Sequence, residues 1–443
     1  MKDVIIKKIR EQVLLHKDDL VVPKEYLLTN NKGMCKKLSK IDQNTWFSLE
    51  KSDLFKNDFK LENPKGLLKD KILCRKIKLK LAKDQKFKLD IWFKACTQMY
   101  NESIVYIKKT KCTAKRKVRT ELKEIRDDIK RNSGVMLGKR EIKIYTHTLD
   151  SMIGLACTNY KSAFTNLRNK NITHFRIRRW KFNTNKIIKL EHQCLNKPKA
   201  TFYKLFGNLK TYYDGKEYDL TTIDKECVLK YNVQSNEYYL FIPVDKIAER
   251  SENRSNLICI DPGLRTFLSG VSNNHILEIG NNIQSKIKRK YLDIDELKKR
   301  KINGKKKKKI LLRLRRKLKN LKDELHWKSI NYLVKNYDNI LIGDLNSKGT
   351  VKRGGVLQPM SKRMMYFYSF FQFKTRLKDK CEQYGCTLNI IDEVYTSKMC
   401  SSCGNIKTDL GGNKTYNCTN CNLSIDRDRN SCKCIYAKNF LKK

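Results

Sequence analysis

The sequence predicts a multidomain α+β protein that ends in an α/β domain with a four-cysteine insertion. Its 443 residues suffice for about two to four domains, which can bury about 75% of the surface of the unfolded chain. Apolar residues recur first with a helical period, then with a period of two, and finally in strands that alternate with helices. Two Cys-x2-Cys pairs near the C-terminus interrupt this last pattern.

Lysine and arginine dominate the charge of the chain. There are 97 Lys and Arg against 46 Asp and Glu, a formal net charge of +51. Such a protein repels itself unless a polyanion neutralises it. Because each neutralised phosphate releases counterions, the surplus indicates an extended nucleic acid held along much of the surface. A biased genome, visible in the abundant Lys, Asn and Ile, is the alternative explanation.

The sixteen cysteines do not read as a disulfide framework. Twelve are scattered, often in apolar stretches where a reduced thiol packs as a small hydrophobic group. The N-terminus MKDVIIKKIR lacks an apolar segment followed by a cleavage site, and no apolar run approaches about 18 residues. We therefore expect an intracellular protein in a reducing compartment, neither secreted nor membrane-spanning, and a nuclear one if the host is eukaryotic.

The first half of the chain predicts a strand, helices and then a β-rich segment. Residues 1–72 give no motif and form an extension of unknown role. In RKIKLKL, three apolar residues alternate with lysines as in a half-buried strand: Ile77, Leu79 and Leu81. A helix begins at Lys83 with Asp84 near its positive end. Apolar residues recur along this helix at helical spacing: Phe87, Ile91, Ala95 and Met99.

The helical pattern continues to about residue 169 and is strongly basic. The stretch KKTKCTAKRKVRTELKEIRDDIKR predicts a solvated helix pair that contacts phosphates rather than bases. Between about 170 and 252, the segments HFRIRRWKF, IIKLEH, CVLKYNV and EYYLFIPV predict short strands of a small β-barrel or curled sheet. Aromatic residues among them are expected in the core, with base stacking as the alternative: Trp180, Phe182, Phe202, Tyr203 and Tyr239.

From residue 256 onwards strands alternate with helices. The strand LICI ends at Asp261, and Asp-Pro-Gly turns the chain into a second strand, RTFLSGVS. A helical region at 285–336 contains the lysine run 305–309, interpreted as a solvated loop or nucleic-acid contact, or else a localisation signal. The strand NILIGDLN, an aromatic helix over 361–384 and the strand CTLNIIDEV follow. This alternation predicts a mostly parallel sheet with helices on its faces.

The four cysteines form the most specific motif. Two Cys-x2-Cys pairs are separated by fourteen residues, and Gly404 follows the first pair, as in a tetrahedral zinc site. Four protein ligands leave no open position, so this zinc is expected to be structural and to hold a ribbon over residues 396–424. Its ligands are Cys400, Cys403, Cys418 and Cys421.

Carboxylates on both sides of the cysteines predict a second metal site. Cleavage of a phosphodiester by two Mg²⁺ ions requires several carboxylates to converge, because the ions lie about 3.5–4 Å apart. Asp261 ends a central strand, which is where such ligands meet in an open α/β sheet. An ordinary turn aspartate is the alternative. Asp426 and Asp428 precede a short helix, and one of them can reach the metals.

These segments resemble a known family. IDPGLRTFLSG, LIGDLNSKG, VYTSKMCSSCG, CTNC and DRDRNSCKCIYAKN are similar to the RuvC-type nuclease half of the TnpB family. That family comprises transposon-encoded RNA-guided DNA endonucleases related to type V CRISPR effectors, with eukaryotic and giant-virus relatives called Fanzors. The stretch KIKLKLAKDQKFKLDIWFKACTQMYNES resembles the family's first strand and helix. The likeness runs from about residue 73 to the C-terminus and is weakest in the barrel.

The resemblance implies an RNase H-like (RuvC) α/β nuclease domain with an inserted zinc ribbon. A β-barrel wedge domain with an inserted helical recognition domain would precede it. The expected boundaries are 1–72 for the extension, 73–83 and 170–252 for the wedge domain, 84–169 for the recognition domain, 253–395 and 425–443 for the nuclease domain, and 396–424 for the ribbon.

By position, the resemblance makes Asp261 the first catalytic aspartate and Asp428 the last, with Asp426 as its neighbour. The middle acid departs from the family pattern. The family has a glutamate directly before Asp-Leu, where this chain has Gly343, and glycine cannot bind a metal.

Three possibilities follow for the middle acid. Asp344 lies one residue along, but a shift of one residue on a strand turns a side chain to the opposite face. Glu393 ends the next strand and is favoured, because Fanzor-branch members are similar in using a glutamate displaced downstream. Asp392 would point away from Glu393. A dead site is the third possibility.

The function implied by the resemblance is RNA-guided, Mg²⁺-dependent cleavage of double-stranded DNA beside a short flanking motif, in association with a transposable element. A guide RNA would read the target by base pairing. We expect two catalytic Mg²⁺ ions on Asp261, Glu393 and Asp428, one structural Zn²⁺, and a monomeric protein in a ribonucleoprotein. The alternatives are a catalytically inactive RNA-guided DNA-binding protein and a structure-specific junction nuclease or transposase accessory protein.

One helix segment is a candidate for contact with the flanking motif. Tyr100, Asn101 and Ser103 lie together on the first predicted helix. The alternative is that these side chains only cap or pack that helix.

Overall fold

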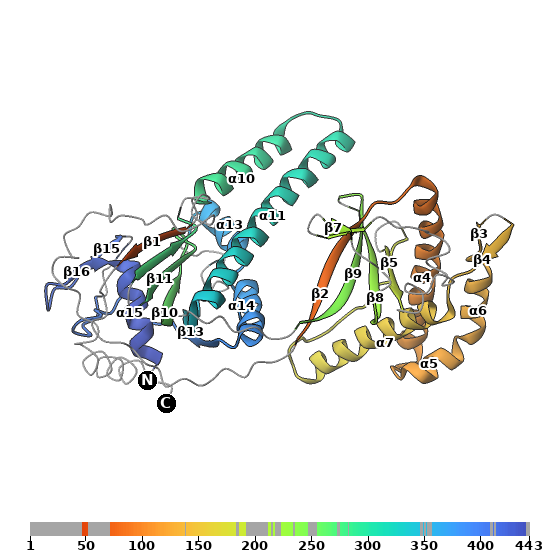
Figure 1. Cartoon of the computed structure of the whole chain (residues 1–443), viewed down its shortest axis with the longest axis horizontal. Coiled ribbons are helices and arrows are strands. Elements are labelled where there is room, and N and C mark those ends of the chain that lie inside the picture. The colour runs from red at the N-terminus through yellow and green to blue at the C-terminus, as the bar shows by residue number, and fades with distance from the viewer. Residues whose placement is uncertain are drawn as a thin grey trace. The chain divides into compact units, whose positions relative to one another are not determined.

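The computed structural model describes residues 47–51, 71–137, 139–182, 186–191, 211–213, 216–217, 223–233, 235–246, 255–272, 275–281, 283–345, 349, 351, 357–407, 411 and 413–439. The chain divides into two compact units, one formed by Met1–Lys71 and Ile247–Lys443, the other by Ile72–Lys246 (Figure 1). Within these described ranges, none of the helices has the length and apolar character needed to cross a bilayer.

Two long helices pack together in the unit Ile72–Lys246. They are α4 (Lys83–Thr110) and α7 (Thr146–Arg168). Helix α4 begins where the sequence predicts, with Asp84 in its first turn. Phe87 is exposed, however, so the predicted apolar stripe of this helix starts only at Ile91. Between the long helices, the basic stretch forms the expected pair of short helices, followed by a hairpin: α5 (Lys115–Glu121), α6 (Lys123–Arg131), β3 (Val135–Leu137) and β4 (Arg140–Ile142).

A six-stranded sheet completes this unit. Its order is β5 (Lys186–Leu190), β8 (Cys227–Asn232), β9 (Glu237–Lys246), β2 (Lys71–Leu79), β6 (Thr211–Tyr213) and β7 (Lys216–Glu217). Ile77 and Leu79 of β2 are buried, as their alternation with lysines predicts. The outer strands β5 and β7 do not pair within the described residues, so closure into a barrel stays a prediction.

The expected strand HFRIRRWKF is wrong. Residues 174–182 lie outside any sheet because they pack against helix α4 instead. The Trp180 ring stacks on Tyr100 at 4.0 Å, and its backbone N–H and C=O both bond the side-chain amide of Asn101. Tyr100, Asn101 and Ser103 are buried, as the packing alternative for these three residues requires, and their contact with a flanking motif stays a prediction.

The other unit is built on a mixed six-stranded sheet. Its order is β1 (Phe47–Lys51), β12 (His275–Ile279), β11 (Leu268–Ser272), β10 (Ser255–Pro262), β13 (Tyr337–Gly343) and β14 (Thr387–Ile391). Strand β1 comes from the extension that gave no motif, and it joins the sheet edge beside β12.

The prediction of a mostly parallel sheet is wrong. Three of the five pairings are antiparallel: β1 with β12, β12 with β11, and β11 with β10. Only β10 with β13 and β13 with β14 are parallel. The chain passes from β10 to β11 and on to β12 through short connections, whereas parallel neighbours need a crossover of about a dozen residues or more.

Helices cover both faces of this sheet. Four lie on one side: α10 (Ile283–Lys299), α11 (Gly304–Asn336), α13 (Pro359–Tyr368) and α14 (Phe370–Tyr384). Helix α15 (Arg427–Asn439) lies on the other. Consecutive residues of β10 therefore face opposite cores: Ile258 and Ile260 pack toward the four helices, and Leu257 and Cys259 pack toward α15.

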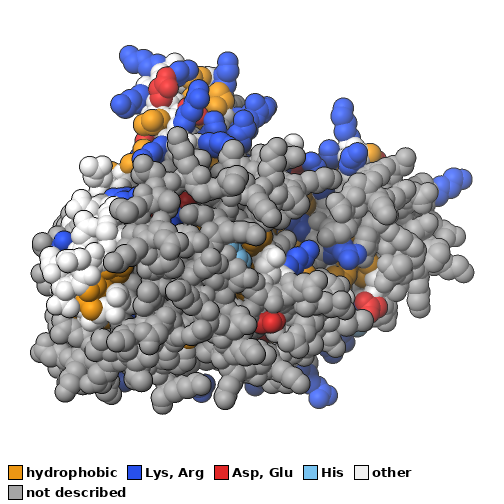
Figure 2. Space-filling model, turned by 60° about the vertical axis from the view of Figure 1, so that its left-hand side comes forward, with side chains coloured by type: hydrophobic (Ala, Val, Ile, Leu, Met, Phe, Trp, Pro, Cys, Tyr) orange, Lys and Arg blue, Asp and Glu red, His pale blue; other side chains and the backbone are white. Residues whose placement is uncertain are grey.

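Two helix predictions need correction. The lysine run 305–309 does not lie in a loop, because helix α11 begins at Gly304 and includes it. Figure 2 shows Lys and Arg side chains gathered over the end of the α10–α11 pair, at the top of the view. The aromatic helix expected at 361–384 is two helices, which break at Ser369 where the backbone is left-handed (φ 47°).

Phe267 is the centre of the aromatic core beneath the four helices. It is fully buried, and its ring lies 5.0–5.7 Å from those of His326, Tyr368, Phe370 and Phe373. The side chain follows directly from the turn after β10, so it anchors that turn to the helices.

We expect Phe267→Ala to lower the free energy of unfolding by about 3–5 kcal/mol, because it leaves a cavity in a packed core. Urea denaturation followed by circular dichroism measures the change. Phe371→Ala is the matched control. The side chain of Phe371 is 80% exposed, so this substitution should change the free energy of unfolding by no more than about 0.5 kcal/mol. Equal losses in the two variants would contradict the assignment of this core.

Candidate functional sites

Strand β10 aims Asp261 toward helix α15. Side chains alternate along a strand, so Asp261 shares the face of Leu257 and Cys259, which pack in the core around α15. Asp261 is half-buried and ends the strand next to the parallel neighbour β13. The structure therefore places this carboxylate at the carboxyl end of a central strand.

The two aspartates at the start of α15 have different surroundings. Asp426 Oδ1 accepts hydrogen bonds from the backbone N–H groups of Asp428 (2.9 Å) and Arg429 (3.3 Å), so Asp426 caps the helix. Asp428 lies in the first helical turn, with its side chain 19% exposed. Asp426 is engaged with the backbone, whereas the charge of Asp428 raises the pKa of Asp261.

Glu393 lies two residues beyond β14, in the loop that leads to the cysteines. Its Oε1 atom is buried and has no hydrogen-bond partner in the part of the chain that the structure describes. A Cβ atom at position 343 would overlap Oε1 and lie 2.7 Å from Cγ and Cδ of Glu393. The Glu393 carboxylate thus fills the space that a side chain at position 343 would need, and Gly343 makes room for it.

Asp344 and Asp392 point elsewhere. Asp344 is exposed and forms an ion pair with Lys374 of α14, on the opposite side of the sheet from α15. The Asp392 carboxylate is 65% exposed and lies 3.6 Å from Lys438 Nζ. Neither acid faces Asp261.

Burial raises the pKa values of Asp261, Glu393 and Asp428. Burial raises the pKa of Asp261 well above its usual value, and the charges of Glu393 and Asp428 raise it further, against a hydrogen bond from Ser431. Burial brings the pKa of Glu393 to about 7. Burial and then the neighbouring Asp426 raise the pKa of Asp428. A cation among these carboxylates would relieve both effects.

The residues present fit a hard divalent cation. Mg²⁺ prefers carboxylate oxygens, and the unpartnered Oε1 of Glu393 is a free ligand atom beside Asp261. Among the described residues, only the cysteine quartet has ligand atoms that all lie within 4.8 Å of one another. The three carboxylates do not form such a group, so their binding of Mg²⁺ stays a prediction.

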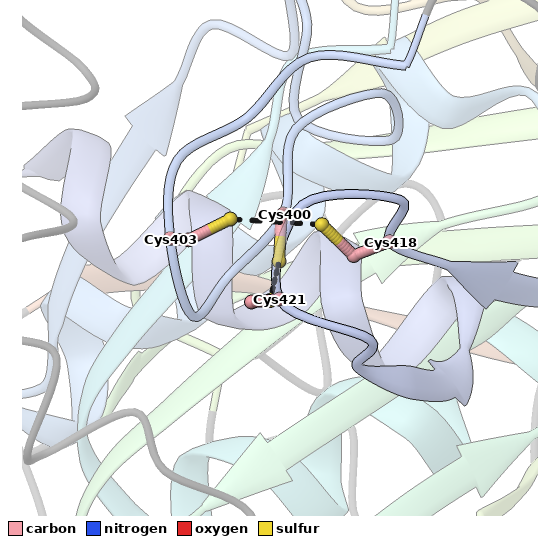
Figure 3. Close-up of side chains that lie close together, drawn as sticks. All are labelled: Cys400, Cys403, Cys418 and Cys421. Carbon is pink, nitrogen blue, oxygen red and sulfur yellow. Dashed lines mark hydrogen bonds between the residues drawn. The ribbon is translucent and has the colours of Figure 1, made fainter.

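The four cysteines converge as a zinc site requires (Figure 3). Sulfur atoms of Cys400 and Cys421 lie 3.6 Å apart, as do those of Cys403 and Cys418. Zinc–sulfur bonds of about 2.3 Å in a tetrahedron give sulfur–sulfur edges of about 3.8 Å, close to these distances. Gly404 has φ 68°, a left-handed conformation that explains glycine after the first pair. The quartet can hold zinc with little rearrangement.

The segment that carries the four cysteines is connected to helix α15 by its backbone and by several side chains of the helix, among them Asn430. Strand β15 (Thr415–Asn417) pairs with β16 (Ser424–Asp426), which runs directly into α15. Asn430 of α15 donates to the Met399 carbonyl (2.6 Å) and accepts from the Ser401 N–H (2.9 Å), both beside Cys400. Sequence reasoning missed Asn430, because nothing in its local pattern distinguishes it from other polar residues of the helix.

The fold is that of a mixed α+β protein, in which a segment with four converging cysteines lies between the half-buried Asp261 and the first turn of α15. Residues 370–435 match the family model described as Cas12f1-like, TNB domain. TnpB-like protein L79 of Acanthamoeba polyphaga mimivirus is 34% identical over 400 residues, which cover 84% of this chain and 73% of that protein. The chain belongs to the TnpB-like family.

Further relatives come from two viruses. TnpB-like protein L770 of the same mimivirus is 33% identical over 397 residues, covering 84% of this chain and 73% of that protein. The putative transposase A625R of Paramecium bursaria Chlorella virus 1 is 29% identical over 305 residues, which cover 64% of this chain and 67% of that protein. A solved chain described as part of a Cas12f1-sgRNA-target DNA complex is less similar, with a TM-score of 0.44 and 15% sequence identity. The match covers 80% of this chain and 82% of that chain.

We expect Cys418→Ser to lose the bound zinc and to lower the melting temperature, because it removes one of four ligands of a structural site. Metal content by mass spectrometry and a thermal melt measure both effects. Cys74→Ser, at an exposed cysteine in the other unit, should leave zinc content unchanged. Full zinc retention in Cys418→Ser would show that the ligands are assigned wrongly.

The raised pKa of Glu393 predicts how the metal-free protein responds to pH. Its folded-state pKa of about 7 exceeds the usual 4.5, so the folded state binds more protons than the unfolded state between these values. Stability should therefore fall as pH rises through this range.

Thermal melts without divalent cations should show a smaller fall in Glu393→Gln than in the wild type. Adding Mg²⁺ at about pH 8 should stabilise the wild type, since a ligand that binds only the folded state raises its melting temperature. The same pH dependence in the two proteins would contradict the role given to Glu393.

Proposed function

We propose that this protein is an RNA-guided DNA endonuclease that uses Mg²⁺ held by Asp261, Glu393 and Asp428. One observation carries the proposal: the unpartnered carboxylate oxygen of Glu393 lies over Gly343, beside Asp261. In a TnpB-like chain, this is the place where the family's middle acid would be. When bound, the Mg²⁺ ions would activate a water molecule and stabilise the charge on the phosphate oxygens.

The residues around Asp261, Glu393 and Asp428 hold these acids in position and shift their pKa values. Strand β10 fixes Asp261 in a central position, while the capped start of α15 fixes Asp428. The enclosed position of Glu393 limits its contact with water, so its carboxylate gains most from a cation. Arg427 stands close to Asp428, at 3.7 Å, and lowers the pKa of Asp261 against the effect of burial.

The charge of the chain and its relatives support the guided part of the proposal. A net charge of +51 exceeds what a few phosphate contacts would need. We assign the wedge role to 73–83 and 170–252, the recognition role to 84–169 and the nuclease role to the rest of the chain from 253, with 396–424 as ribbon. The names of its viral relatives include a putative transposase, which supports an association with a mobile element. The protein would act as a monomer in an intracellular ribonucleoprotein, nuclear in a eukaryotic host.

The test of the proposal measures cleavage of double-stranded DNA by the purified ribonucleoprotein. Asp261→Ala should lower the cleavage rate by about a hundredfold or more while the copurified RNA stays bound, because the variant loses a metal ligand and no RNA contact. Removing the RNA should abolish cleavage in the wild type. Cleavage at full rate after RNA removal would instead support a junction nuclease that recognises DNA shape.

Gly343 motivates the second candidate, an inactive RNA-guided DNA-binding protein. The position of Glu393 favours the active enzyme, and the two are separated by Glu393→Gln. If the wild type cuts and this variant does not, the inactive alternative is excluded. A wild type that binds target DNA with its RNA and never cuts it would establish the alternative.

We expect Gly343→Ala to lower the cleavage rate by about tenfold to a hundredfold with little loss of stability. The added methyl group would displace the flexible end of Glu393 without disturbing the backbone. Cleavage kinetics and a thermal melt measure the two effects. Gly304→Ala is the control, because a Cβ there meets nothing within 4 Å. Unchanged cleavage in Gly343→Ala would argue against Glu393 as a ligand.

A further inference from the structure

Glu393 lies in a loop that belongs to no helix or strand. Residues 392–398 follow β14 with an irregular backbone, and Tyr395 among them is left-handed (φ 68°) although it is not glycine. Such a conformation persists only where the surrounding structure holds it. Contacts from other elements therefore decide where this loop lies, and with it the carboxylate of Glu393.

The side chain of Lys438 bonds this loop on both sides of Glu393. Its ammonium group donates one hydrogen bond to the backbone carbonyl of Asp392 (2.7 Å) and another to that of Val394 (2.8 Å). The Asp392 carboxylate is a third acceptor, 3.6 Å from Nζ. An ammonium group has three N–H donors, so these three groups of one short loop can satisfy it completely.

The helix dipole does not explain this position of Lys438. The residue stands in the last turn of α15, where a cation offsets the negative end of the helix. A cation that serves only this purpose can remain in solvent beside the last carbonyl groups of its own helix. Lys438 is instead 7% exposed and bonds carbonyl groups 44 and 46 residues earlier in the chain. Burying an ammonium group is costly unless it is paired, so the loop is what fixes this side chain.

The bonds of Lys438 leave the Glu393 carboxylate free. They go to the backbone before and after this residue, while Oε1 of Glu393 has no hydrogen-bond partner among the described residues. A lysine paired directly with the carboxylate would compete with a cation for the same oxygen atoms. Bonds to the flanking backbone can hold the acid in place without occupying it.

Helix α15 supports the same loop at two further points. The carbonyl of Glu393 accepts hydrogen bonds from the N–H (3.1 Å) and the hydroxyl (2.9 Å) of Thr396. The hydroxyl of Ser431 in α15 donates in turn to the Thr396 hydroxyl (3.3 Å). At the end of the helix, Asn439 accepts a hydrogen bond from Asn389 of β14 (3.2 Å). The helix therefore contacts both the loop and the strand that leads into it.

We propose that Lys438 is a positioning residue, which holds Glu393 within reach of a cation shared with Asp261 and Asp428. The inference rests on the proposed function and adds to it a residue that acts through the backbone. Helix α15 carries Asp428 in its first turn and Lys438 in its last, so one rigid element sets the separation of two acids from different segments. A carboxylate that is ordered beforehand binds a cation more tightly, because binding then has no loop to order.

The experiment compares two buried lysines near Glu393. Lys438→Met keeps the length of the side chain and removes its donors and its charge. Lys374→Met is the matched control: Lys374 is 9% exposed and, within the described residues, pairs with Asp344 rather than with the loop. After the effect of burial, the charge of Lys374 lowers the pKa of Glu393 more than that of Lys438 does. An effect of charge alone would therefore be larger in the control.

The first measurement is the cleavage rate of the ribonucleoprotein against Mg²⁺ concentration. We expect Lys438→Met to raise the Mg²⁺ concentration for half-maximal rate by about tenfold or more, as removal of a residue that orients a metal ligand typically does. The rate at saturating Mg²⁺ should change less, since the bound cation itself orders the loop. Lys438→Arg, which keeps the charge and several donors, should recover most of the loss.

The second measurement does not depend on cleavage. Without Mg²⁺, hydrogen–deuterium exchange of the full chain should be faster in the peptide that contains residues 392–396 in Lys438→Met than in the wild type or in Lys374→Met. The rise in melting temperature on adding Mg²⁺ should also need a higher concentration in Lys438→Met. If this variant does not fold, Lys438→Gln, which keeps a donor at a shorter reach, takes its place.

Three outcomes would overturn the role of Lys438. They are an unchanged Mg²⁺ requirement in Lys438→Met, an equal or larger rise in Lys374→Met, and unchanged exchange of the peptide 392–396. The proposed function fails differently: a wild type that shows neither cleavage nor stabilisation by Mg²⁺ contradicts it. A wild type whose Mg²⁺ response is lost in Glu393→Gln and kept in Lys438→Met contradicts the positioning role alone.

Discussion

The enclosure of three acids within the unit built on the mixed sheet is the constraint on which the rest of that unit depends. Alternation along β10 sends Asp261 toward α15, and the cap at Asp426 fixes the first turn of that helix, which carries Asp428. Burial then raises the pKa values of Asp261, Glu393 and Asp428, and the charges of the other two acids raise that of Asp261 further. A fold that buries carboxylates in this way, at a cost to its own stability, suits the binding of cations among them.

The side chain of Glu393 occupies its position only because residue 343 is a glycine. The same volume beside Asp261 can be filled by a side chain from position 343 or by the carboxylate of Glu393, but not by both. If Glu393 serves as the middle acid proposed above, its carboxylate comes from the loop after the neighbouring strand instead of from position 343. Chemistry at such a site constrains where the oxygens are, and leaves open which residue carries them.

Sequence reasoning succeeded where local physics decides the structure. The spacing of the four cysteines, the burial of Ile77 and Leu79 in β2 and the start of α4 depend on residues close in sequence. The TnpB-like family was also recognised from short motifs, and the viral relatives confirm it. The grouping of Asp261, Glu393 and Asp428 around metals stays a prediction.

The features that could not be predicted from the sequence depend on contacts between residues that are far apart in the chain. Strand β1 is defined by its partner β12, more than 200 residues later, and the break at Ser369 by a left-handed residue that is not glycine. Segment 174–182 has the alternation of a strand, yet Asn101 and Tyr100 hold it on α4. A period of two shows which side chains face inward, and it does not show whether a neighbouring strand exists to pair with.

The hydrogen bonds of Asn430 link the cysteine-containing segment to helix α15 and so to residues outside that segment. They connect the loop around Cys400 with the helix that begins at the last acid, and β16 enters that helix without a break. Oxidation of the cysteines, or a chelator selective for zinc, would loosen this connection and shift Asp428 although neither agent touches a carboxylate. The four sulfur atoms and the last acid are thus joined through a single helix, and a change at one would be transmitted to the other.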